Sequence, residues 1–258
     1  MMKKPTIQTI YDWLDSVAPF ESQETFDNAG LQLGHPDQEV ASILLALDVT
    51  GAVVEEAADQ KVDLIISHHP LIFSPLTSLR EDRYVPRMLC QLIKKDISLI
   101  SAHTNLDKSA FSGSLAMLRR LGLSNIRQAD DYALIGDFEE EVSGAEAQTR
   151  IARVLDNPVV KYGATKKKIK SLAAAGGAYS EGFHAAQLAG ADAFLTGEVR
   201  HHHAVEAADA GIVLFEGGHF ATEKLMMGAL AQGLQSALDA LKYTVQVYVS
   251  QQIPYLRD

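Results

Sequence analysis

Short apolar runs of strand length alternate with amphipathic helical segments along most of this chain. The predicted strands are Ser42–Asp48, Val62–Ser67, Ile97–Ser101, Ser171–Ala175, residues 191–196 and Ile212–Phe215. The predicted helices are Ile7–Val17, Ala52–Gln60, Pro86–Lys94, Ser112–Leu121, Tyr179–Leu188 and His203–Ala210. Strands that are apolar throughout need cover on both faces, which helices provide in parallel sheets. We therefore predict an α/β fold with mixed, mostly parallel sheets flanked by helices.

The second half of the chain repeats the pattern of the first. Residues 191–196 align with Val62–Ser67, and the strand at 212–215 aligns with the one that begins at Ile97. Such a pseudo-repeat predicts two structurally similar α/β halves, although chance similarity between βαβ units is the alternative. We expect the halves to comprise residues 1–125 and 126–258. No low-complexity linker separates them, which favours a tight or intertwined arrangement.

Composition excludes several classes of protein. The 258 residues carry a formal net charge of -10, which argues against general nucleic-acid binding. No apolar run approaches the roughly 18 residues of a membrane span. The single cysteine, Cys90, cannot form an internal disulfide, and the lysines at the N-terminus precede no apolar signal segment. We therefore expect a cytoplasmic protein that does not bind membranes.

Two adjacent histidines follow the second predicted strand, in Ser67-His68-His69-Pro70. This position lies at the carboxyl edge of the sheet, where α/β proteins bind ligands. Because neighbouring strand residues point to opposite faces, we expect two metal ions about 3.5 Å apart, each bound by one imidazole. A hydrogen-bonded histidine pair at a strand end is the alternative.

A histidine and a carboxylate four residues later follow the next strand, at His103 and Asp107. Carboxylate oxygens can bridge two cations, which suits Asp107. His103 is expected to be a ligand, to orient one, or to move a proton in catalysis. Alternatively, Asp107 and Ser109 cap the next helix.

The same spacing recurs at His219 and Glu223, after two glycines that allow a sharp turn. On a helix these two side chains share one face, although Glu223 could instead complement the helix dipole. All three segments follow predicted strands at one sheet edge. We therefore predict that two divalent ions (zinc, iron, manganese, cobalt or nickel) bind a single ligand set. Its members are His68, His69, Asp107, His219 and Glu223.

A fourth segment carries Glu198 and three consecutive histidines. In the pseudo-repeat, Gly197-Glu198 occupies the place of the adjacent histidines, so Glu198 is expected to be a general base or an acceptor that orients a ligand. His201, His202 and His203 fan over about 200° of a helix, so at most two can face one site. The alternative is that they are partly exposed residues at a helix start.

Five motifs in the same order resemble the Ngg-interacting-factor-three-like family, whose bacterial members are known as GTP cyclohydrolase I type II homologues. The motifs are FDNAGLQLG from Phe26, SHHP, SAHTNLD, LTGEVRHH and EGGHFATE. The resemblance implies two intertwined α/β halves and a ring-shaped homohexamer whose metal sites face a central cavity. It assigns the dimetal ligands to the five residues predicted above. The family often has tryptophan at the position of Phe26.

Two functions are compatible with these features. The first is a metal-dependent hydrolase of the GTP cyclohydrolase type, acting on a nucleotide or similar small heterocycle. The alternative is a metal-handling (metallochaperone or storage) or scaffold protein without turnover. The alternating run Tyr243–Tyr255 must pair within its half or across an interface. With the resemblance, it leads us to expect a homohexamer that prefers small-molecule substrates or single-stranded tails.

Overall fold

The computed structural model describes residues 3–163 and 168–255, and it divides into two compact units. The first comprises Met1–Ala110 and Met227–Asp258, and the second comprises Phe111–Met226. These units differ from the expected halves, residues 1–125 and 126–258. Residues from 227 onward belong to the first unit because strand β11 (Gln246–Val249) extends its sheet. The chain therefore leaves the first unit and later returns to it, as intertwined halves require.

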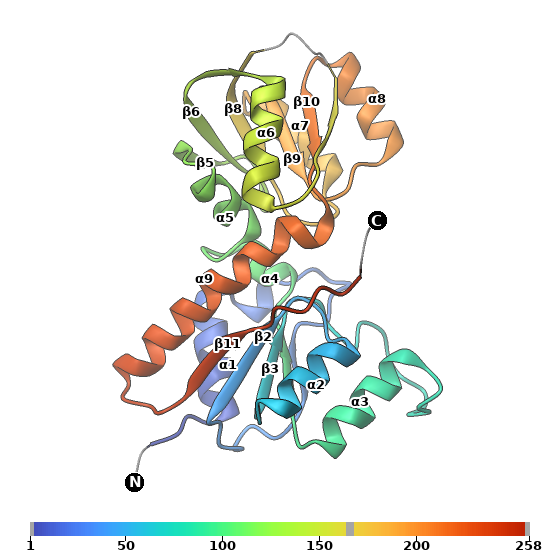
Figure 1. Ribbon diagram of the computed structural model, residues 1–258, viewed down its shortest axis with the longest axis vertical. Coiled ribbons are helices and arrows are strands. Elements are labelled where there is room, and N and C mark those ends of the chain that lie inside the picture. Colours follow the sequence, from blue (N-terminus) through green and yellow to red (C-terminus); the bar gives the residue numbers. More distant parts are fainter. Residues whose placement is uncertain (1–2, 164–167, 256–258) are drawn as a thin grey trace. The chain divides into compact units, whose positions relative to one another are not determined.

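The first unit contains a five-stranded sheet in the order β1-β4-β3-β2-β11. Figure 1 labels its strands β3, β2 and β11. Its strands are β1 (Gly30–Leu33), β2 (Ser42–Ala46), β3 (Leu64–Ser67), β4 (Ser98–Ser101) and β11. All neighbouring pairs are parallel except β1 with β4. Every residue of β2, β3 and β4 is buried, as their apolar sequences predict. The helices of this unit are α1 (Ile7–Val17), α2 (Gly51–Asp59), α3 (Tyr84–Lys94) and α4 (Thr104–Asp107).

The second unit contains a six-stranded sheet in the order β5-β6-β8-β9-β10-β7. Its strands are β5 (Ser124–Gln128), β6 (Leu134–Ser143), β7 (Val160–Tyr162), β8 (Lys168–Ala174), β9 (Ala193–Thr196) and β10 (Val213–Glu216). Only β8, β9 and β10 are parallel, so this sheet is more antiparallel than expected. The reason is that β5, β6 and β7, which the apolar pattern did not reveal, all pair in antiparallel fashion.

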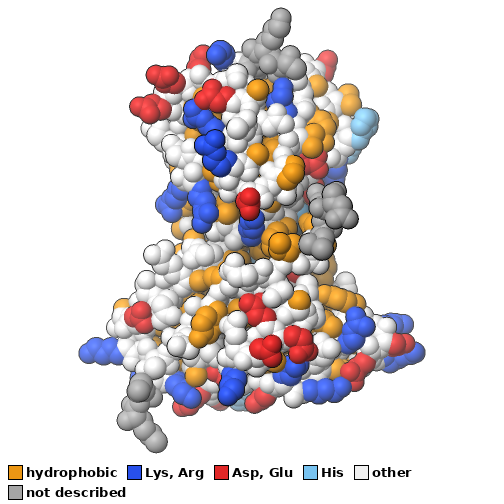
Figure 2. Space-filling model, viewed as in Figure 1, with side chains coloured by type: hydrophobic (Ala, Val, Ile, Leu, Met, Phe, Trp, Pro, Cys, Tyr) orange, Lys and Arg blue, Asp and Glu red, His pale blue; other side chains and the backbone are white. Residues whose placement is uncertain are grey.

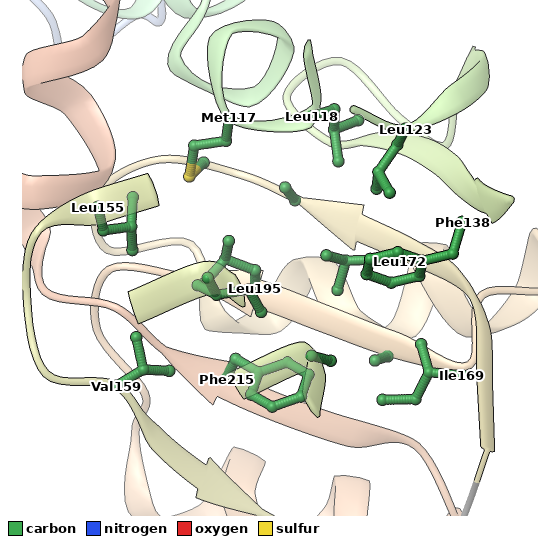
Figure 3. Packing of buried hydrophobic residues seen from close by; sticks show 14 of the residues in the cluster. Met117, Leu118, Leu123, Phe138, Leu155, Val159, Ile169, Leu172, Leu195 and Phe215 are labelled. Atoms are coloured by element: carbon green, nitrogen blue, oxygen red, sulfur yellow. The ribbon is translucent and has the colours of Figure 1, made fainter. Parts of the chain in front are cut away.

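Helices α5 (Gly113–Arg120), α6 (Gly144–Leu155), α7 (Phe183–Leu188) and α8 (His201–Asp209) complete the second unit. Phe138, Leu172, Leu195 and Phe215 of its sheet belong to one apolar core with Met117 of α5 and Leu155 of α6 (Figure 3). Because this core packs helices directly onto the strands, it fixes the strand ends that carry the polar side chains described below.

Hydrogen bonds reveal the pseudo-repeat in detail. The order β2-α2-β3-α3-β4 in the first unit matches β8-α7-β9-α8-β10 in the second. Asp63 Oδ2 accepts hydrogen bonds from the backbone N–H groups of residues 41 and 42, at 2.6 and 3.0 Å. Asp192 Oδ2 accepts from those of residues 170 and 171, at 2.9 and 3.1 Å. The two aspartates align in the predicted repeat, so the fold of two similar α/β halves is confirmed.

Helix α9 (His219–Ala240) contains 22 residues and spans the boundary between the two units in the sequence. Neither α9 nor any other helix of the described residues combines the length and the apolar character needed to cross a membrane. Acidic and basic side chains are interspersed on the face of each unit shown in Figure 2.

Candidate metal centre

Three histidines of the first unit form a cluster at the carboxyl ends of β3 and β4. The ring centroids of His68 and His69 lie 4.9 Å apart. The ring centroid of His103 lies 5.1 Å from that of His68 and 5.6 Å from that of His69. One ring nitrogen from each histidine lies within 4.8 Å of the others. The expectation that the adjacent rings point to opposite faces is therefore wrong. Strand β3 ends at Ser67, so strand alternation does not extend to the two histidines.

Each of these imidazoles has an oxygen partner at Nδ1. The partners are Ala102 O for His68, Asp48 Oδ1 for His69 and Asp27 Oδ1 for His103, each at 2.9 Å. An oxygen acceptor favours the tautomer with its proton on Nδ1, and it also fixes the plane of the ring. Nε2 of each ring is then the nitrogen with a lone pair, which is the form in which histidine binds metals.

The side chain of Asp27, from a distant part of the sequence, is buried beside His103. Its Oδ2 accepts hydrogen bonds from Thr104 Oγ1 and, at 3.0 Å, from Thr104 N. Burial acts to raise the pKa of Asp27, but the hydrogen bonds from His103 and Thr104 outweigh it. The pKa is therefore held well below its ordinary value, and Asp27 remains an anion that orients His103.

Asp107 is the last residue of α4, and its Oδ2 lies 3.8 Å from His68 Nε2. This separation is longer than a hydrogen bond, but it suits two ligands of one ion, each about 2 Å from the metal. The alternative role as a helix cap is wrong for Asp107. The next helix, α5, is capped by Ser112, whose side chain accepts a hydrogen bond from Leu115 N at 3.3 Å.

The second unit has two potential metal ligands, His219 and Glu223, at the start of α9. His219 Nε2 lies 3.2 Å from Glu223 Oε2, so the expectation that both side chains share one helix face is met. His219 Nδ1 lies 2.8 Å from Glu198 Oε1. His219 therefore repeats the pattern of the three histidines of the first unit. Glu198, which lies just beyond β9, supplies the oxygen partner of this imidazole.

Two glycines leave room for this pair. A Cβ atom on Gly177 would lie 2.3 Å from Glu223 Oε1, and the φ of Gly177 is +64°. A Cβ atom on Gly197 would lie 2.7 Å from the Cα atom of His219. Thr222 Oγ1 accepts a hydrogen bond from Gly177 N at 3.2 Å, which ties the glycine segment to α9. The Glu223 side chain is only 5% exposed, so this carboxylate is held in a close-fitting recess.

The three consecutive histidines take different positions at the start of α8. His201 and His202 are exposed, whereas His203 is buried and its Nδ1 lies 2.7 Å from Ser180 Oγ. Burial lowers the pKa of His203. The interpretation as helix-start residues therefore describes His201 and His202, and His203 is part of the packing around Ser180.

Sequence reasoning missed Asp27, Asp48 and Gly177. Asp48 had been included in a predicted strand, yet β2 ends at Ala46, so Asp48 lies at the same sheet edge as the histidines. A carboxylate just beyond a strand end was the sequence signal by which Asp48 could have been found. Asp27 contacts His103 across 76 residues, which no local pattern reveals.

Fold and site together define a class of protein: two similar α/β units, each with imidazole and carboxylate donors just beyond its parallel strands. The chain belongs to the Duf34/NIF3 (NGG1p interacting factor 3) family, whose model matches residues 5–255. The resemblance recognised in the five motifs is thus confirmed.

Curated relatives and solved structures match over nearly the whole chain. It is 32% identical over 238 residues to the GTP cyclohydrolase 1 type 2 homolog of Campylobacter jejuni, covering 89% of this chain and 92% of the relative. It is 28% identical over 255 residues to the protein of the same name from Clostridium acetobutylicum, covering 95% of each. A hypothetical protein of Staphylococcus aureus has a TM-score of 0.93 at 28% identity, covering 99% of this chain and 100% of the other. A NIF3-related protein of Bacillus cereus has a TM-score of 0.94 at 22% identity with the same coverage and supports the fold alone.

Proposed function

We propose that this protein is a metal-dependent hydrolase with a dinuclear centre that acts on a nucleotide or similar small heterocycle, as a GTP cyclohydrolase of type 2 would. The proposed ligands are His68, His69, Asp107, His219 and Glu223. One observation carries the metal part of this proposal. Four imidazoles, those of His103 and the three ligand histidines, each have an oxygen partner at Nδ1. This arrangement leaves the lone pair of Nε2 available to a metal ion and is typical of metal-binding histidines.

The donor set fits divalent cations in number and kind. The first unit offers three imidazoles and the carboxylate of Asp107, and the second offers His219 and Glu223. Five or six donors of this mixture suit two ions of zinc, iron, manganese, cobalt or nickel. We propose that the donors of both units act on the same pair of ions.

Bound divalent ions would supply Lewis-acid polarisation and a water of lowered pKa. The protein's own residues would orient the ligands and move protons. Asp27, Asp48 and Glu198 hold the planes of their imidazole partners. His103, backed by ionised Asp27, is suited to accept a proton at Nε2 and release it. Glu198 is half exposed, and we propose that its carboxylate also accepts a proton from solvent or substrate.

The names of the relatives support the choice of reaction, since two of them are GTP cyclohydrolase 1 type 2 homologs. We further propose a cytoplasmic homohexamer that encloses its metal sites and admits small molecules. The first-unit sheet supports assembly, because β11 pairs only with β2 among the described strands and forms one edge of the sheet. An edge strand of this kind can pair with another chain. Light scattering should give the mass of six chains, and a stable monomer would contradict this part of the proposal.

Metal content and turnover test the proposal separately. Elemental analysis of the purified protein should find two divalent ions per chain, and Asp107→Ala or Glu223→Ala should remove at least one of them. The metal-loaded protein should then convert GTP or another nucleotide to a product of changed mass. Metal binding without turnover of any nucleotide would favour the metal-handling function. Full metal content in both variants would exclude Asp107 and Glu223 as ligands.

A further inference from the structure

Two phenylalanines of the first unit are exposed to solvent although four others, Phe138, Phe183, Phe194 and Phe215, are fully buried. Phe26 is 62% exposed and Phe73 is 47% exposed. Their ring centroids lie 6.4 Å apart, with 43° between the ring planes. The two exposed rings are therefore neighbours, tilted towards each other, although they lie in segments separated by more than forty residues. We refer to Phe26 and Phe73 as the aromatic pair.

Hydrogen bonds hold the backbone beneath the aromatic pair. Ile72, next to Phe73, donates from its N–H to Gln32 Oε1 at 2.9 Å. Its carbonyl accepts from Asn28 Nδ2 at 2.6 Å and from Gln32 Nε2 at 3.2 Å. Asp27, next to Phe26, is held by His103 and Thr104. The rings are thus exposed on fixed loops, and clustered apolar side chains of this kind mark binding surfaces.

The aromatic pair borders the histidine cluster. The ring of Phe73 lies 6.2 Å from the ring of His103, with 79° between their planes. A planar ligand stacked on Phe73, with Phe26 against its side, would therefore lie beside the imidazole of His103. The amides of Asn28 and Gln32 that face Ile72 are used in holding the loop. Contact with such a ligand would therefore depend on the faces of the rings more than on hydrogen bonds.

We infer that Phe26 and Phe73 form a stacking site for the planar ring of a purine-like heterocycle, with the reacting part of the ligand directed towards the histidines. The inference rests on the proposed function for the reaction, but ring binding itself requires no metal. Stacking on π faces tolerates different bases. We therefore expect guanine and adenine nucleotides to bind with similar affinity.

Calorimetric titration with guanosine 5′-monophosphate and with ribose 5-phosphate tests the site, because the second compound lacks only the base. Native protein should bind the nucleotide at least tenfold more tightly. Phe73→Ala and Phe26→Ala should each weaken nucleotide binding by roughly tenfold, the magnitude expected for one lost base–aromatic contact. Phe26→Trp should retain it. Binding of ribose 5-phosphate should be unchanged in every variant.

Ile93→Ala is the matched control. Ile93 is 53% exposed, but it lies near the end of α3, which leads to the amino end of β4 and so to the opposite edge of the sheet. This variant should bind both compounds as the native protein does. Circular dichroism would confirm that each variant is folded.

The outcomes separate this inference from the proposed function. Equal affinity for the two compounds, or unchanged nucleotide binding in both alanine variants, would overturn the stacking site. So would a change in oligomeric mass in those variants with nucleotide affinity unaltered, since the rings would then belong to an interface between copies of the chain. Phenylalanine-dependent nucleotide binding by a protein that holds no metal would refute the proposed function and support the stacking site.

Discussion

Replacement of Gly177 by alanine tests whether the recess around Glu223 needs a glycine. The new Cβ atom would lie 2.3 Å from Glu223 Oε1 and 3.4 Å from both Glu223 Cδ and His219 Nε2. The first distance is far below any normal contact, so the carboxylate must move. A φ of +64° adds about 1–2 kcal/mol of backbone strain for a residue with a side chain.

Gly211→Ala provides the matched control, because Gly211 also has a positive φ, of +74°, but its Cβ would meet nothing within 4 Å. Both variants should lose the same 1–2 kcal/mol, roughly, in the free energy of unfolding from strain. Gly177→Ala should lose more, by about another 1–3 kcal/mol, since the buried carboxylate is displaced from its contacts. Urea unfolding measures this difference.

Metal content should also be lower in Gly177→Ala than in Gly211→Ala. If Glu223 is a ligand, Gly177→Ala should lose metal by elemental analysis, whereas Gly211→Ala should retain it. If Gly177→Ala unfolds at the same urea concentration as Gly211→Ala and keeps its metal, the recess does not constrain Glu223. Glycine is then not required at position 177.

Three further predictions concern individual side chains. Asp48→Asn should weaken metal affinity by roughly 10- to 100-fold with the fold intact, because it removes the carboxylate that orients the proposed ligand His69; a chelator competition measures this, with exposed Asp37→Asn as the control. Burial lowers the pKa of His203 in the folded protein, so the unfolded chain binds a proton more readily at this residue. The stability that neutral His203 contributes is therefore fully present above the ordinary histidine pKa of about 6.5, and it is lost as the pH falls below that value. His203→Gln should therefore reduce the loss of unfolding free energy between pH 8 and pH 5, and an unchanged pH dependence would contradict the assignment. His69→Ala should lower metal content, whereas His202→Ala, on the exposed start of α8, should leave it unchanged.

The sequence predicted the parallel strands well because their burial leaves a continuous apolar signal. The predicted helix Ile7–Val17 matches α1, and the predicted strands lie within one to two residues of β2, β3, β4, β9 and β10 at most boundaries. Strands β5 and β6 gave no such signal. Most residues of β5 are exposed, and β6 contains three consecutive glutamates, 139–141, which are typical of a loop. Antiparallel strands with one solvated face therefore escaped the prediction.

The donors were easier to predict than the residues that orient them. Histidines and carboxylates after strand ends are recognisable because parallel strands bring their carboxyl ends to one edge. The hydrogen bond from His103 to Asp27 and the close approach of Gly177 to Glu223 depend on tertiary packing between distant segments. For the run from Tyr243, the sequence left open which strand it would pair with. The structure pairs the shorter strand β11 with β2.

The register of the two sheets shows how the halves have diverged at their strand ends. Ser67 pairs with Ser101, and Thr196 pairs with Glu216, so Ser67 and Thr196 are equivalent positions. His68 and His69 then correspond to Gly197 and Glu198, as the repeat predicted.

The histidine that follows the last strand is displaced between the halves. His103 lies two residues after the end of β4, whereas His219 lies three residues after the end of β10, so the position equivalent to His219 is Thr104. Glycine at position 197 leaves space that a side chain equivalent to His68 would fill, and the backbone of α9 occupies it. The first half thus supplies a cluster of imidazoles, while the second supplies a carboxylate in a glycine-lined recess. The two halves therefore offer complementary rather than identical donors at equivalent strand ends.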